Sequence, residues 1–159
     1  DPADRLNAET ALPAAPLARL DPGLRRLLEA VPSWTRWPLC SVDPGARWTR
    51  GRIALVGDAA HAMLPFLAQG GAMAIEDAAE LAATIGMHGP TEAALAAYER
   101  RRKPRVVAIW REAERLARVY HLPYPVSIGR DMTLAALGPR RLLERMDRIY
   151  GWRPPTPPA

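Results

Sequence analysis

One stretch of the sequence, residues 51–79, restricts most strongly how this chain can fold. It opens with a short apolar run, residues 53–56, that lies between two glycines. A run of this length and setting predicts a buried strand over residues 52–56. Because α/β sheets bind their ligands at the carboxyl ends of strands, Asp58 is expected at the end of this strand, beside an open cleft.

The segment after the predicted strand has the features of a binding site at a helix start. A loop that contains Pro65 leads through Gln69, Gly70 and Gly71 into an alanine-rich helix predicted from about Ala72. Two glycines at this place let another molecule approach the backbone closely. The unpaired N–H groups of a first helical turn, with the positive end of the helix dipole, suit an anion or a polarised carbonyl.

The same stretch resembles a known family. The sequence GRIALVGDAAHAMLPFLAQGGAMAIEDA is similar to the second flavin-binding motif of FAD-dependent aromatic-ring monooxygenases, and most of all to the salicylate-hydroxylase-like branch. The order of strand, Gly-Asp, Ala-Ala-His, proline loop, Gln-Gly and helix with Glu-Asp is specific, whereas a Gly-Asp pair alone would not be. The resemblance extends more weakly from about Trp34 to Trp152.

The resemblance implies an α/β fold. It indicates the carboxyl-terminal portion of an FAD/NAD(P)-binding Rossmann-like monooxygenase fold, with a short strand region and a helix-rich tail. The expected segments are the end of a substrate-domain region (1–48), the second FAD-binding motif with a helical carboxyl-terminal region (49–150), and a disordered tail (151–159). The family's G-x-G-x-x-G turn, which binds the ADP half of FAD, is not in this sequence. Family chains are also more than twice as long, so this chain is expected to be part of a longer enzyme and inactive alone.

The resemblance also implies an activity and a cofactor site. The enzyme would be an FAD-dependent monooxygenase that hydroxylates an aromatic acid or phenol, with NAD(P)H and dioxygen as co-substrates. Asp58 would accept a hydrogen bond from a ribityl hydroxyl of FAD, and the carbonyl of Pro65 would lie near flavin and substrate. Backbone N–H groups at the helix start would face the edge of the isoalloxazine where reduction places negative charge. The expected cofactor-binding residues are Gly57, Asp58, Pro65, Gln69, Gly70, Gly71 and Ala72; no catalytic acid–base residue is identified.

Other polar residues near the motif are expected to be structural. His61 would brace the loop, because no second metal-ligand residue stands at a suitable spacing for a metal site. Glu76 and Asp77 would tie the helix to neighbouring backbone. The basic run 100–103 would either contact a phosphate or another domain, or form a solvated face that pairs with Glu99 and nearby acids; the second interpretation is favoured.

The charge balance supports one alternative function. The chain has 22 Lys and Arg against 17 Asp and Glu, for a net charge of +5. A non-catalytic basic helical module that binds a partner protein or nucleic acid is therefore the alternative to an enzyme. The arginines are spread along predicted helices without interleaved aromatic residues, so the pattern does not favour nucleic acid. One cysteine and no apolar run of the roughly 20 residues that a membrane helix needs favour a cytoplasmic protein.

Local signals predict the remaining elements. Asp21 and Thr91 stand at predicted helix N-caps, and Gly89 follows a predicted helix end. The other expected elements are a loop or frayed segment over 1–20, a helix over 22–30, an irregular edge strand over 34–42, and helices over 92–120, 128–137 and 139–150.

Overall fold

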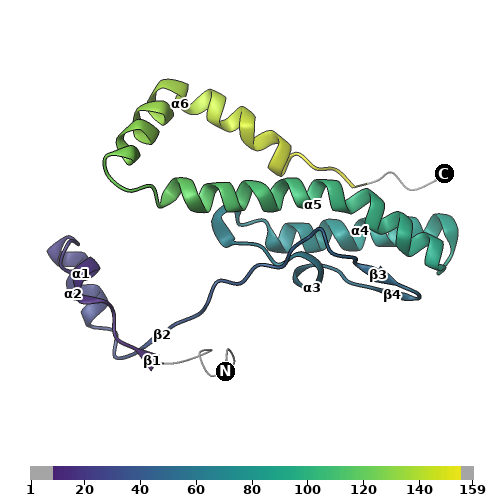
Figure 1. The fold of residues 1–159 in the computed structure, drawn as a ribbon, viewed down its shortest axis with the longest axis horizontal. Coiled ribbons are helices and arrows are strands. Elements are labelled where there is room, and N and C mark those ends of the chain that lie inside the picture. Colours follow the sequence, from purple (N-terminus) through teal and green to yellow (C-terminus); the bar gives the residue numbers. More distant parts are fainter. Residues whose placement is uncertain (1–8, 155–159) are drawn as a thin grey trace. The chain divides into compact units, whose positions relative to one another are not determined.

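The computed structural model describes residues 9–154 (Figure 1). The chain divides into two compact units, Asp1–Leu39 and Cys40–Ala159, which are described separately. This division falls before the boundary at residue 48 that the sequence suggests, and the assignment of residues 1–48 to a substrate domain stays a prediction. The predicted tail over 151–159 lies partly outside the described residues.

The first unit contains a small strand pair and two short helices. Strand β1 (Glu9–Thr10) pairs antiparallel with β2 (Trp34–Thr35). Between them lie α1 (Ala14–Leu17) and α2 (Pro22–Glu29). The side chain of Asp21 accepts hydrogen bonds from the amides of Gly23 and Leu24, as its predicted N-cap role requires. The expected loop over 1–20 is wrong for residues 9–10 and 14–17, where β1 and α1 form; residues 1–8 lie outside the described part.

The central strand of the motif is shorter and more exposed than the sequence predicts. Strand β3 (Thr49–Arg50) turns at Gly51, which has φ of 56°, into β4 (Ile53–Ala54), and the two pair antiparallel. Ile53 is 68% exposed, and Leu55 and Val56 are also exposed. The prediction of a buried strand over 52–56 is therefore wrong for this chain. In the described residues β4 pairs with β3 alone, so no further strand lies beside it; Ala54 packs against the core, whereas Ile53 is left exposed.

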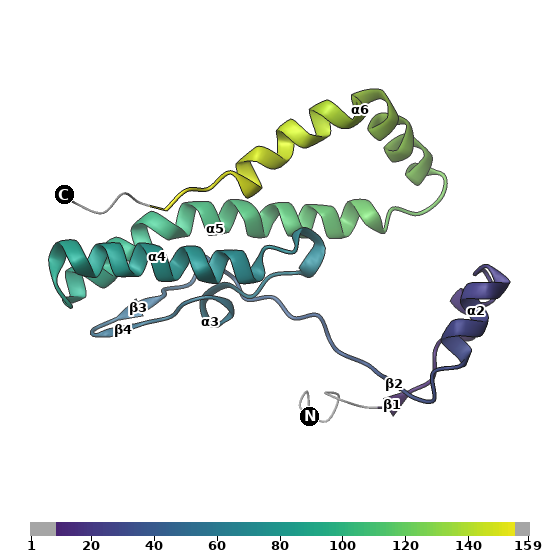
Figure 2. The same cartoon turned by 180° about the vertical axis from the view of Figure 1, so that it is seen from behind.

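Two long helices form the body of the second unit. Helix α4 (Gly70–His88) and helix α5 (Glu92–Tyr120) lie along one another in both views (Figures 1 and 2). Gly89, with φ of 69°, ends α4, and the hydroxyl of Thr91 accepts from the amide of Ala94 to cap α5. Both boundary predictions are confirmed, and α4 begins two residues before the expected start.

The core lies where the two long helices meet the segment before the strand pair. Its buried side chains include Trp48, Met73, Tyr98, Val106 and Ile109. The hydroxyl of Tyr98 donates to the carbonyl of Leu55 at 3.1 Å, so the chain just after β4 is fastened to α5. This contact brings the Gly-Asp turn close to the helix pair.

The last helix bends over α5. Helix α6 (Val126–Tyr150) contains a break at Gly138, which has φ of 69°. The break agrees with the two separate helices predicted on either side of Gly138-Pro139, and Figure 2 shows the resulting elbow. Among the described residues, no helix has the length and apolar character needed to span a membrane.

Glu99 gives the chain a testable pH dependence. Its carboxylate accepts from the amide and hydroxyl of Thr49 and from Lys103 Nζ at 2.7 Å. Burial alone would raise the pKa of Glu99, but these hydrogen bonds outweigh it and lower the pKa to about 2 from 4.5. A depressed folded-state pKa adds stability above the unfolded-state value, and this stability is lost as pH falls through the folded-state value.

We therefore expect the free energy of unfolding to fall between about pH 4.5 and pH 2. Replacing Glu99 with glutamine should flatten this part of the profile, which urea titrations at several pH values would measure. The matched control is Glu92→Gln, at an exposed carboxylate near the start of α5. A wild-type profile identical to that of Glu99→Gln over this range would contradict the assignment.

Candidate functional site

The Gly-Asp turn places an exposed carboxylate against the start of α4. Gly57 adopts φ of 58° and ψ of −140°, and the short helix α3 (Asp58–His61) begins directly after it. Asp58 is exposed, and its Oδ1 lies 3.7 Å from the position that a Cβ on Gly70 would occupy. Two residues that are twelve positions apart in the sequence are thus neighbours, as the binding-site prediction requires.

The start of α4 presents free backbone donors beside that carboxylate. Gln69 at the N-cap provides no side-chain cap. The amides of Gly70, Gly71 and Ala72 have no hydrogen-bond partner among residues 9–154, whereas the amide of Met73 bonds to the carbonyl of Gln69. A Cβ added at Gly71 would meet nothing within 4 Å, so the backbone there is open to close approach.

The loop between the Gly-Asp turn and α4 contains two more of the residues predicted to bind the cofactor, Pro65 and Gln69. Pro65 begins the 3-10 helix η2 (Pro65–Leu67) and is exposed, and Ala68 then adopts a left-handed conformation with φ of 52°. Gln69 is only 5% exposed, so its side chain points away from solvent. We call the group formed by Asp58 and the α4 residues 70–72 the seat.

A buried ionic network lies directly beneath the seat. Asp77 of α4 is fully buried and accepts from the amide of Gly57 at 2.9 Å and from Arg102 Nε at 2.8 Å. Its Oδ2 also lies 2.6 Å from Nε2 of His61. Burial alone would raise the pKa of Asp77, but its hydrogen bonds outweigh burial and hold that pKa below the usual value. The ionised carboxylate can only accept, so His61 Nε2 carries the proton in this bond.

The network agrees with the structural roles predicted for His61 and Asp77, whereas Glu76 bonds to arginine side chains and not to backbone as predicted. His61 is fully buried, lies tilted against Trp48 with 5.2 Å between ring centroids, and braces the turn rather than facing solvent. Glu76 is held by Arg102 NH1 and by Arg105. Within the described part of the chain, no group of three or more His, Cys, Asp or Glu residues could hold a metal ion.

Arg102 is the important residue that sequence reasoning did not single out. The sequence places it in the basic run 100–103, for which a solvated face is the favoured interpretation, but Arg102 is only 2% exposed. Its neighbours do follow the expected pattern, because Arg101 pairs with Glu80 and Lys103 pairs with Glu99. Arg102 stands four residues after Tyr98 and four before Val106, on the buried stripe of α5. An arginine at that spacing is the signal that could have revealed it.

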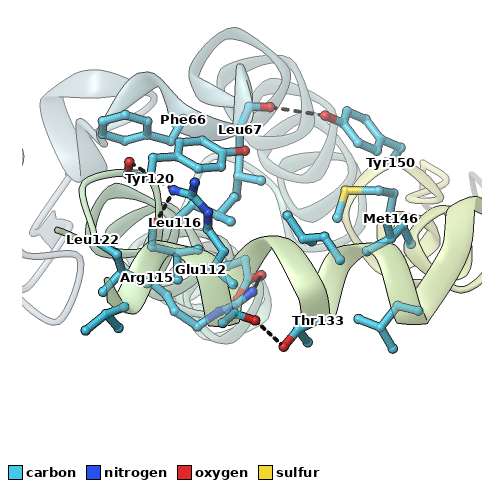
Figure 3. A pocket seen from close by; sticks show the side chains of 17 residues that line it. Phe66, Leu67, Glu112, Arg115, Leu116, Tyr120, Leu122, Thr133, Met146 and Tyr150 are labelled. Carbon is cyan, nitrogen blue, oxygen red and sulfur yellow. Dashed lines mark hydrogen bonds and ion pairs between the residues drawn. The ribbon is translucent and has the colours of Figure 1, made fainter. Parts of the chain in front are cut away.

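A separate cavity lies between η2, α5 and α6. It has a volume of about 750 Å³ and is lined mainly by apolar side chains of η2, α5 and α6 (Figure 3). Asp58 and Gly70 are not among its lining residues, so this cavity is distinct from the seat. Tyr150 at the end of α6 donates to the carbonyl of Leu67 at 3.3 Å and so ties α6 to η2. That Asp58 borders a cleft stays a prediction.

Residues 27–113, which contain the seat and the network, match the family described as FAD binding domain. The chain belongs to this family. The family membership and the α/β flavoprotein fold class predicted from the motif are thus confirmed. The match covers the Gly-Asp turn, the proline loop, α4 and most of α5, which include the seat and the ionic network beneath it.

The names of curated relatives are those of a hydroxylase and a monooxygenase of small aromatic compounds. The chain is 33% identical over 135 residues to 3-hydroxybenzoate 6-hydroxylase of Klebsiella oxytoca, a match that covers 84% of this chain and 34% of that protein. It is 44% identical over 109 residues to 6-hydroxynicotinate 3-monooxygenase of Bordetella bronchiseptica, covering 67% of this chain and 27% of that protein. The chain therefore spans about a third of the length of these relatives or less.

A solved structure shows the same fold. The crystal structure of a Klebsiella pneumoniae HpxO variant complexed with FAD matches with a TM-score of 0.61 and 28% sequence identity. The match covers 88% of this chain and 42% of that one. The fold of this FAD-binding-domain chain is therefore that of part of a known flavoprotein.

Proposed function

We propose that this chain forms the seat for the ribityl chain and isoalloxazine ring of FAD in a monooxygenase. The observation that carries the proposal is the exposed Asp58 carboxylate next to the unpaired amides at the start of α4. The whole enzyme would hydroxylate a small aromatic acid or phenol, with NAD(P)H and dioxygen as co-substrates. The named activities of the relatives support this substrate class.

The residues of the seat fit the chemistry of this cofactor. An exposed carboxylate accepts strongly from a hydroxyl, so Asp58 is suited to a ribityl hydroxyl. The amides of Gly70, Gly71 and Ala72 are suited to an electron-rich ring edge, which the α4 dipole stabilises without a cationic side chain. The chemistry that FAD supplies when bound is electron transfer from the nicotinamide and oxygen transfer from dioxygen to the ring. The role of this chain is to bind and orient the cofactor and to polarise its ring.

Replacing Asp58 with alanine in the whole protein should weaken FAD binding by about 10- to 100-fold, because one charge-assisted hydrogen bond is worth about 1.5–3 kcal/mol. Asp58 is exposed, so the free energy of unfolding should change little. Flavin fluorescence quenching by titration measures the affinity. Asp131→Ala is the control, because Asp131 is an exposed carboxylate of α6 outside the seat. Equal affinities of wild type and Asp58→Ala would overturn the proposal.

Replacing Gly71 with alanine tests the close approach of the cofactor separately from the charge. Alanine is a better helix former than glycine and its Cβ would meet nothing within 4 Å among the described residues, so stability should hold or rise by up to about 1 kcal/mol. The new methyl should nevertheless weaken FAD binding about tenfold or more by overpacking the contact. The control is Gly86→Ala, at a second open position on α4. Unchanged FAD affinity in Gly71→Ala would show that the cofactor does not lie on this turn.

A further inference from the structure

The turn that carries Asp58 depends on one buried carboxylate. Gly57 lies in a backbone conformation, φ of 58° and ψ of −140°, that is essentially restricted to glycine and costs free energy. Such a conformation persists only where its surroundings hold it in place. Here the amide of Gly57 donates to Asp77 Oδ2 at 2.9 Å, a bond buried from solvent.

Asp77 is itself held from two other directions. Arg102 of α5 donates to its Oδ1 at 2.8 Å, and His61 of α3 bonds to its Oδ2 at 2.6 Å. The carboxylate therefore joins α4 and α5 to both ends of the Gly57–His61 segment. All three of these side chains are at most 2% exposed, so solvent cannot replace any of these bonds.

The network continues to the carboxyl end of α6. Arg102 NH1 also donates to Glu76 Oε2 at 2.6 Å, and Glu76 accepts from Arg105 Nε at 2.6 Å. Arg105 in turn donates to the carbonyls of Arg148 and Ile149 at 2.9 Å, at the carboxyl end of α6. Three helices are thus joined by charge-assisted bonds that converge on Asp77 and Glu76, which makes the position of Asp77 well defined.

We propose that Asp77 is a positioning residue of the FAD site. By holding the Gly57 amide, it fixes the turn so that the Asp58 carboxylate stands against the open amides of α4. Asp77 touches neither solvent nor the exposed face of the seat, so it acts through Gly57 and not by contact with the cofactor. This inference rests on the proposed function, because the cofactor is the ligand that the seat would bind.

The decisive variant is Asp77→Asn. Asparagine keeps the shape of the side chain but has one acceptor oxygen in place of two. We expect that oxygen to face the cationic Arg102, so the NH₂ group takes the place of Oδ2 and cannot accept from the Gly57 amide. We expect faster hydrogen exchange of the Gly57 amide, measured by NMR on residues 1–159 without flavin. In the whole protein we expect FAD binding to weaken by about 10- to 100-fold, as for the loss of one charge-assisted hydrogen bond.

The matched control is Glu80→Gln. Glu80 is also a buried carboxylate on α4 that pairs with an α5 arginine, Arg101, at 2.9 Å, but among the described residues no hydrogen bond or ion pair links its side chain to the Gly57 turn. This variant should change neither the Gly57 amide exchange nor the FAD affinity. If both variants lower FAD affinity equally, the effect is general destabilisation and the proposal is overturned. An unchanged Gly57 amide in folded Asp77→Asn overturns it as well.

Two further outcomes are decided by the wild-type protein. If Asp77→Asn does not fold, hydrogen exchange in the wild-type chain still tests the proposal. The Gly57 amide should exchange much more slowly than the Gly71 amide, which is exposed and has no partner among the described residues. Equal exchange of the two amides overturns the proposal. If the wild-type whole protein binds no FAD, the proposed function is overturned, while the amide exchange still decides whether Asp77 holds the turn.

Discussion

Replacing Arg102 with alanine should destabilise the second unit by about 3–5 kcal/mol, the cost of removing one partner from a buried ion pair. The guanidinium is 2% exposed and donates to both Asp77 and Glu76. Its loss would leave two carboxylates in a buried site with fewer donors. Urea unfolding of residues 1–159, followed by circular dichroism, measures the change.

Arg101, the residue before Arg102, provides a control variant with the same side-chain chemistry. Arg101 also pairs with an α4 carboxylate, Glu80, but its own side chain is 45% exposed. Exposed ion pairs contribute about 0–1 kcal/mol, so Arg101→Ala should cost no more than that. Similar losses in the two variants would contradict a buried network centred on Arg102.

Replacing Gly57 with alanine should cost about 2–5 kcal/mol, from backbone strain and overpacking together. The backbone at φ of 58° and ψ of −140° disfavours any Cβ. An added Cβ would also lie 3.1 Å from the Cβ of Ala74 on α4, closer than ordinary van der Waals contact. Thermal or urea unfolding of the variant measures the loss, and the whole protein should also lose FAD affinity because the turn moves.

Gly86→Ala is the matched control for this prediction. Gly86 lies in the same helix that Gly57 packs against, and a Cβ there would meet nothing within 4 Å. Because alanine is the better helix former, this substitution should stabilise the chain by up to about 1 kcal/mol. A Gly57→Ala variant as stable as Gly86→Ala would show that the turn can relax, and would remove the physical reason for glycine at position 57.

The locally determined parts of this fold could be predicted from the sequence. Asp21 and Thr91 cap helices, and Gly89 ends one, because a cap depends on residues within three or four positions of each other. The break of α6 at Gly138 has the same local origin. The open amides at Gly70 and Gly71 also follow from the order of residues at a helix start.

The sequence does not predict burial correctly where burial depends on neighbours far along the chain. The apolar run at 53–56 has the composition of a buried strand, yet Ile53 is 68% exposed. Burial of a strand requires other elements on its faces, and in the described residues β4 has β3 as its one strand partner. The composition of a segment indicates that it can be buried, but the packing of other elements against it decides whether it is buried.

The sequence by itself determined the motif, and with it the family, because the Gly-Asp turn, the proline loop and the glycine-rich helix start are consecutive in the chain. Only the tertiary structure revealed which hydrogen bonds hold the Gly-Asp turn in place. The bond from Arg102 to Asp77 spans 25 positions and the bond from Asp77 to Gly57 spans 20. Charge along a sequence gives no sign of which arginine is desolvated, since burial of a charge is decided by the opposing helix and the acceptors it presents.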